Sequence, residues 1–206
     1  MRGNAFESLT AITHASPQSV KLESKTIQKQ ATALTAIDPS LIKEVDLGCF
    51  KHKVDEGVFV RKAAYGLIET MIEKIPERVE AAAATEVAIK GLDDTAEECM
   101  IQSLSILHRL VLWSPIIVVT HIDSLIDQFT KLFQKNMPNI AANDKSKNIM
   151  RSVIRVIEQL SRTQEIDGNT RFAEFFKQQI QDSNQAREIF QNIAATASQA
   201  VFNEHF

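Results

Sequence analysis

The stretch from residue 60 to residue 75 constrains the fold most, because its apolar residues recur at helical spacing over about four turns. They follow the spacing i, i+3, i+4, i+7 and i+8, and they are Val60, Ala63, Ala64, Leu67, Ile68, Met71, Ile72 and Ile75. A stripe of this kind is typical of a helix that packs one face on a core. Pro76 follows the stripe and is expected to end the helix.

Similar patterns predict helices along most of the chain. The predicted helices span residues 6–14, 19–37, 77–90, 95–112, 115–134, 147–160, 171–181 and 184–200. Gly91 is the expected C-terminal cap of the helix before it. Asp94 with Glu97 forms a capping-box pattern at the start of the helix predicted over residues 95–112. Ser114 is the expected N-cap of the next helix, with Pro115 at its first position. Short turns between these helices indicate antiparallel pairs.

The well-patterned second helices start about 40 to 50 residues apart, which is the period of HEAT repeats. We therefore predict an all-α fold, a HEAT-repeat α-solenoid of about four helix pairs in a single domain over residues 1–206. On the second helix of such repeats, a small pair such as Ala63-Ala64 lets helices approach, and an arginine such as Arg61 bonds a neighbouring turn. The end repeats of a solenoid expose a surface that normally packs on a neighbouring repeat, so self-association through these ends is a further possibility.

Residues 41–57 break the helical pattern, because their apolar residues alternate with polar ones at a period of two. Val45 and Leu47 alternate with acidic residues before Gly48, and Phe50, His52 and Val54 alternate with lysines after it. Two alternating runs around a glycine predict an inserted β-hairpin. The alternative is an irregular loop between helices whose alternation is accidental.

Composition and charge exclude several classes of function. The net charge of −3 and the pI of about 6.0 provide no basic field for nucleic acid or an anionic membrane. The longest apolar run, Ile116–Val119, is far too short to span a bilayer, and no signal-peptide pattern begins the chain. Cys49 and Cys99 form no disulfide framework and are expected to be a turn thiol and a buried small side chain. The expected compartments are cytoplasm and nucleus.

No motif for catalysis, a cofactor or a metal is present. The histidines are scattered, with no metal-binding pair at i, i+4, and no glycine-rich phosphate loop or nucleophile elbow occurs. Cys99 with His108 lacks a third orienting group, and nearby glutamates disfavour the thiolate. We therefore expect a protein that is not an enzyme, with no catalytic residue, metal or cofactor.

Two small basic patches each allow two interpretations. One combines Lys51-His52-Lys53 with Arg61-Lys62, and the other comprises Lys145, Lys147 and Arg151. Each is either a solvated face or a surface that pairs with an acidic partner.

One segment of the sequence resembles a known family. The runs Leu41–Gly48, Phe50–His52, Val54–Gly57 and Arg61–Tyr65 resemble the C-terminal domain of the cullin-associated, neddylation-dissociated proteins, also described as TATA-binding-protein-interacting factors. Weaker similarities at 10–16, 150–160 and 174–193 follow in the same order, so the resemblance covers essentially the whole chain.

The resemblance implies a HEAT module that binds the N-terminal domain of an unneddylated cullin. A hairpin at Ile42–Val54 would compete there with the adaptor, as part of an exchange factor for cullin-RING ubiquitin ligases. The binding residues implied by the resemblance are Val45, Leu47, Phe50, Lys51, His52, Lys53 and Val54. The family's long N-terminal array is absent from these residues, so we expect only the adaptor-competing end of a cullin clamp.

Two other interpretations stay open. The chain could serve as a generic HEAT scaffold without a cullin partner, or take a transcription-associated role through a TATA-binding protein. The identity of the cullin is also open at this stage.

Overall fold

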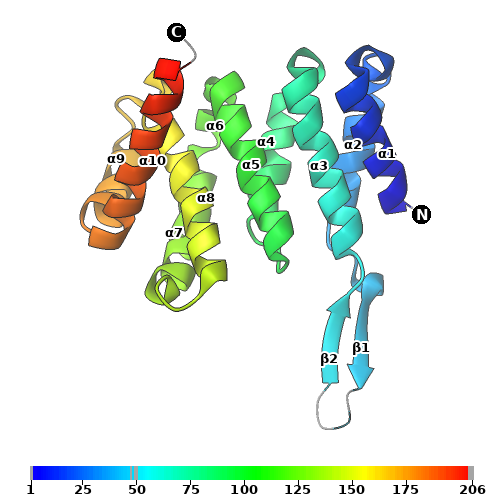
Figure 1. The fold of residues 1–206 in the computed structure, drawn as a ribbon, viewed down its shortest axis with the longest axis horizontal. Coiled ribbons are helices and arrows are strands. Elements are labelled where there is room, and N and C mark those ends of the chain that lie inside the picture. The colour runs from blue at the N-terminus through cyan, green and yellow to red at the C-terminus, as the bar shows by residue number, and fades with distance from the viewer. Residues whose placement is uncertain (1, 47, 49–50, 204–206) are drawn as a thin grey trace. The chain divides into compact units, whose positions relative to one another are not determined.

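A computed structural model describes residues 2–46, 48 and 51–203; for Arg2 and residues 198–203 it describes only the helical backbone. The described part of the chain is mainly helical and divides into two compact units, residues 1–109 and 110–206. This agrees with the predicted all-α, HEAT-like class (Figure 1). The single domain over 1–206 and the number of repeats stay predictions.

The first unit contains the N-terminal helices and the only sheet among the described residues. Its elements are α1 (Arg2–Ala15), η1 (Pro17–Val20), α2 (Ser24–Leu34), η2 (Pro39–Leu41), β1 (Ile42–Asp46), β2 (Lys51–Asp55), α3 (Val58–Lys74), η3 (Pro76–Arg78), α4 (Ala81–Gly91) and most of α5 (Glu97–Trp113). Helix α1 packs on α3, and α2 packs on α3 and α4. Helices α1 and α3 therefore form one layer, with α2 and α4 behind it (Figure 1).

The predicted stripe forms the core side of α3. Ala64, Leu67, Ile68, Met71, Ile72 and Ile75 are buried, and Val60 and Ala63 are half-buried. Tyr65 is also buried, at 2% exposure, because its ring faces α4 and α5. In the segment predicted as a helix over residues 19–37, Val20 is buried, whereas Leu22 is 96% exposed.

Gly91 differs from the prediction in conformation. It lies inside the last turn of α4 and lacks the left-handed backbone of a C-cap glycine. A Cβ atom there would lie 2.5 Å from the hydroxyl of Tyr65 and closer still to Oγ of Ser103. The sequence has glycine at this position because two neighbouring helices approach the α4 backbone.

A buried side chain links α2 to the start of α4. Gln28 is 4% exposed; its Nε2 donates to the carbonyl of Glu80 at 3.0 Å, and its Oε1 accepts from the Glu80 N–H at 2.9 Å. Glu80 is the N-cap residue of α4, and its N–H has no partner within the helix, so Gln28 supplies the acceptor for that N–H. The Glu80 carbonyl also accepts from the Ala84 N–H at 3.0 Å, so the Gln28 amide adds a second donor there. No local sequence signal indicated this contact.

Residues 110–206 form the second unit. Its elements are α6 (Pro115–Thr120), α7 (Ile122–Asn136), η4 (Met137–Asn139), α8 (Asp144–Leu160), η5 (Gln164–Ile166), α9 (Thr170–Phe176), the π-helical turn η6 (Lys177–Gln181) and α10 (Asn184–Asn203). Helix α8 packs on α7 and α10, and α9 packs on α7. Met150, Val153, Ile154 and Ile157, within the helix predicted over residues 147–160, are all buried.

The helix predicted over residues 115–134 is interrupted at His121. Four β-branched residues, Ile116–Val119, precede the break and lower helix propensity there. Before the break, Val118 is buried and Val119 is only half-buried. Pro115 occupies the first turn as expected, but the side chain of Ser114 makes no capping hydrogen bond.

Candidate functional site

The predicted hairpin is present and extends beyond the ends of α2 and α3 (Figure 1). Strands β1 and β2 are antiparallel, with Val45 opposite His52 and Glu44 opposite Lys53. All residues of β1 are exposed, as are those of β2 except the half-buried Asp55. Gly48, between the strands, has a φ of 85°, a left-handed conformation that favours glycine.

The register divides the hairpin into two faces, because directly opposed residues point to the same side of a two-stranded sheet. We call one the apolar face; it comprises Lys43, Val45, His52 and Val54. We call the other the charged face; it comprises Ile42, Glu44, Asp46, Lys51, Lys53 and Asp55. The predicted binding residues are thus separated, with Val45, His52 and Val54 on one face and Lys51 and Lys53 on the other.

Each face carries an ion-paired lysine; on the apolar face, Nζ of Lys43 lies 2.7 Å from Oε2 of Glu56. On the charged face, Nζ of Lys51 lies 3.8 Å from Oε2 of Glu44, so part of its charge is balanced within the hairpin. On the apolar face, Val45 and Val54 remain 40% and 38% exposed. Leu47 and Phe50, also predicted to bind, and Cys49 lie outside the described residues.

Arg61 anchors the base of the hairpin. Its guanidinium is 1% exposed and donates from Nε to Oδ2 of Asp94 at 2.8 Å and from Nη2 to Oδ1 of Asp94 at 3.0 Å. Nη2 also lies 2.9 Å from Oδ2 of Asp55, the last residue of β2. The arginine therefore joins the hairpin to the turn between α4 and α5. The repeat pattern predicted that Arg61 bonds a neighbouring turn, without identifying which one.

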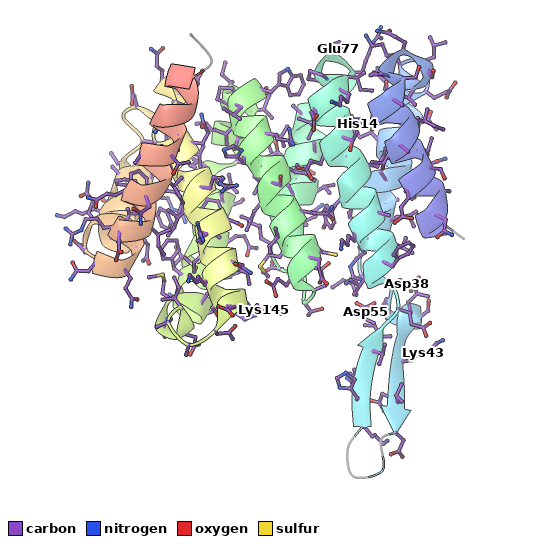
Figure 2. All side chains as sticks on the ribbon, viewed as in Figure 1. His14, Asp38, Lys43, Asp55, Glu77 and Lys145 are labelled. Carbon is purple, nitrogen blue, oxygen red and sulfur yellow. The ribbon has the colours of Figure 1, made fainter. Side chains whose placement is uncertain are left out.

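The two carboxylates complete the anchor through backbone contacts. Asp94 accepts from the N–H of Ala96 at 2.8 Å, in the turn that leads into Glu97, the first residue of α5; the capping box of Asp94 with Glu97 stays a prediction. Asp55 accepts from the N–H of Gly57 at 2.8 Å. A Cβ atom at Gly57 would lie 3.0 Å from Asp55 and 3.1 Å from Arg61, so a small residue suits this turn. Figure 2 shows Asp55 where β2 meets α3, and Lys43 farther along β1.

This environment changes the titration of the anchor. The hydrogen bond from Arg61 lowers the pKa of Asp55 below its usual value, against the opposing effect of burial, and the Gly57 N–H lowers it further. Burial acts to lower the pKa of Arg61, but the hydrogen bonds to Asp94 and Asp55 outweigh it and the pKa is raised. Both groups are therefore charged at neutral pH.

Acid should weaken this anchor. Because the pKa of Asp55 is lower in the folded than in the unfolded chain, its contribution is complete above about pH 4 and is lost as pH falls further. We expect Asp55→Asn to lower the free energy of unfolding by about 1–2 kcal/mol at neutral pH. Urea unfolding of both proteins at about pH 6 and pH 3 checks this, because the difference should shrink at the lower pH. A difference that is the same at both pH values would contradict the ion-pair explanation.

The Cys99 thiol is poorly suited to act as a nucleophile. The side chain is fully buried, and burial, with a smaller contribution from Asp94, raises the pKa of the thiol to about 11. The thiol is therefore protonated at neutral pH and a weak nucleophile.

Within residues 2–46, 48 and 51–203, no group of three His, Cys, Asp or Glu side chains is arranged to hold a metal ion. No helix in that part of the chain is both long and apolar enough to cross a bilayer.

These features define a class of protein: an all-α, HEAT-like chain with a β-hairpin that projects from the helices and is anchored by a buried arginine. Comparison with known proteins gives the family. The chain belongs to the TIP120 family, described as TATA-binding protein interacting (TIP20), whose model matches residues 2–180.

Three relatives illustrate the similarity. The chain is 26% identical over 183 residues to cullin-associated NEDD8-dissociated protein 1 of Dictyostelium discoideum, covering 87% of this chain and 15% of that protein. It is 29% identical over 176 residues to the Arabidopsis thaliana protein of the same name, covering 84% and 14%. It is 29% identical over 134 residues to the Emericella nidulans protein named as the C-terminal part, covering 62% and 12%. The chain therefore spans about 15% of the length of the first relative.

Proposed function

We propose that this chain is a cullin-binding module whose hairpin competes with the adaptor for the N-terminal domain of an unneddylated cullin. Family membership supports the class of partner, since the relatives are named as cullin-associated proteins. On this proposal the module helps to exchange adaptors on cullin-RING ubiquitin ligases. It would act in cytoplasm and nucleus, where thiols such as Cys99 stay reduced.

The exposed hairpin is the observation that carries the proposal. A two-stranded sheet is marginal in water, yet this one leaves Val45 and Val54 exposed on one face. Main-chain and side-chain contacts at its base hold it instead, namely the Glu56 N–H to the Leu41 carbonyl at 3.0 Å and the Arg61 ion pairs. Exposed apolar side chains on a supported, projecting element are typical of a protein-binding surface.

A competition experiment tests the proposal. The chain is immobilised, an unneddylated cullin N-terminal domain is captured, and increasing adaptor is added. We expect the adaptor to release the cullin, because both proteins would occupy one surface. A stable ternary complex of chain, cullin and adaptor would refute competition, and failure to capture any unneddylated cullin would refute the partner.

The two faces of the hairpin allow a narrower prediction. We expect Val45→Thr with Val54→Thr to weaken cullin binding about tenfold, because threonine keeps the β-branched shape but adds a hydroxyl to an interface that must exclude water. The comparison pair, Lys51→Thr with Lys53→Thr, removes the two predicted binding residues of the charged face. Because the narrower prediction assigns most of the affinity to the apolar face, this pair should change the Kd by less than about threefold. Titration calorimetry measures both. The reverse order of effects would place the binding surface on the charged face.

A further inference from the structure

A row of basic side chains lies on the exposed side of α8, well away in sequence from the hairpin. Lys147, Arg151 and Arg155 are all exposed and recur at i, i+4 and i+8. At 1.5 Å rise per residue, neighbouring members lie about 6 Å apart along the helix and the row extends about 12 Å. We call these three residues the α8 basic row.

The α8 basic row is not neutralised by its own helix. Within the described part of residues 110–206, ion pairs join Arg162 to Glu158 and Arg171 to Asp123 and Asp127, and none of these involves a member of the row. Between Lys147 and the end of α8 the single acidic residue is Glu158, which is 2% exposed and pairs with Arg162. Asp144 is the nearest acidic residue before the row, at the first position of the helix.

The arrangement is unfavourable for the isolated chain. Like charges at i and i+4 on a helix repel each other and destabilise it slightly. The net charge of the protein is −3, so a row of three unpaired cations is a local exception rather than part of a basic surface. A bound carboxylate between two members would relieve the repulsion, and arginine binds carboxylates through two parallel hydrogen bonds.

We propose that the α8 basic row is a docking surface for an acidic protein segment, independent of the hairpin. An extended segment presents side chains to one side every second residue, about 6.7 Å apart, which nearly matches the spacing of the row. Three carboxylates in such a segment therefore reach all three cations. The small extent of the row and the negative net charge favour a short protein segment over a long nucleic-acid polyanion.

Fluorescence anisotropy with a labelled peptide of about ten Asp and Glu residues tests the proposal at ionic strengths of about 50 and 150 mM. We expect binding that weakens with salt and that falls about tenfold in Arg151→Glu with Arg155→Glu. Lys25→Glu with Lys29→Glu is the matched control, because these exposed lysines on α2 have the same i, i+4 spacing and give the same change in net charge. The control should change the Kd less than about twofold.

Three outcomes would overturn the proposal: no binding to the unaltered chain, equal weakening by both double variants, or tighter binding of a short DNA duplex that the α8 variant abolishes. Equal weakening would indicate a response to net charge, and the DNA result would assign the row to nucleic acid. Each result is separate from the cullin competition experiment, which depends on the hairpin and not on α8.

Discussion

Arg61→Met is expected to lower the free energy of unfolding by about 3–5 kcal/mol, because it leaves a buried carboxylate without its partner. The side chain of Asp94 is 3% exposed and accepts two hydrogen bonds from Arg61. Methionine fills a similar volume, so the loss reports the missing charge rather than a cavity. Urea unfolding followed by circular dichroism measures it.

A second arginine provides the control. Arg109 lies 3.1 Å from Glu69 and 3.2 Å from Glu73, but its side chain is 37% exposed. Solvent screens such pairs, so Arg109→Met should cost no more than about 1 kcal/mol. In a double-mutant cycle, Arg61→Met with Asp94→Asn should cost less than the sum of the single changes, because the stranded charge is removed. Similar losses at Arg61 and Arg109 would mean that burial adds nothing to the anchor.

Gly91→Ala is expected to destabilise the protein by about 1–3 kcal/mol through overpacking. Helix propensity alone predicts the opposite, a gain of about 0.5–1 kcal/mol. The steric effect should dominate because the new methyl group meets the hydroxyl of Tyr65, whose ring is 2% exposed and cannot move aside freely. Thermal unfolding compares the variant with the parent.

Gly66 in α3 is the matched control for that change. A Cβ atom there would meet only the flexible end of Gln102, at 3.3 Å from Nε2, so Gly66→Ala should be neutral or stabilising by up to about 1 kcal/mol. Adding Ser103→Ala to Gly91→Ala should recover part of the loss, because Oγ of Ser103 also occupies the space of the new methyl group. A stabilised Gly91→Ala protein would show that propensity outweighs packing here.

Local patterns predicted the features that depend on neighbours in the sequence. The stripe of α3 follows from apolar residues that recur every three or four positions, and the hairpin follows from apolar residues that recur every second position. The hydrogen bond from the Ala96 N–H to Asp94 is also local, since the two residues are two positions apart. The break at His121 was missed, because the apolar pattern continues through β-branched residues that weaken the helix.

Features that depend on distant residues could not be read from the sequence. The repeat pattern indicated that Arg61 bonds a neighbouring turn, but its partner Asp94 lies 33 residues away. Gln28 and Glu80 are 52 residues apart, and neither belongs to a motif. The separation of the hairpin into two faces required the strand register, which assigned Val45 and Lys51 to opposite sides. Gly91 was predicted to be a cap because it follows a helical pattern. The close approach of Tyr65, which explains the glycine, is a tertiary contact that the sequence does not show.

The Arg61 anchor has a consequence for the thermodynamics of partner binding. A flexible loop loses conformational entropy when a partner fixes it, and this loss reduces its affinity. Here both strands are ordered as the chain folds, since Asp55 holds β2 to the helices before any partner arrives. If the proposed function holds, binding of a cullin to this hairpin should show a small entropic penalty, and the association rate should be limited by the conformation of the partner rather than that of the hairpin.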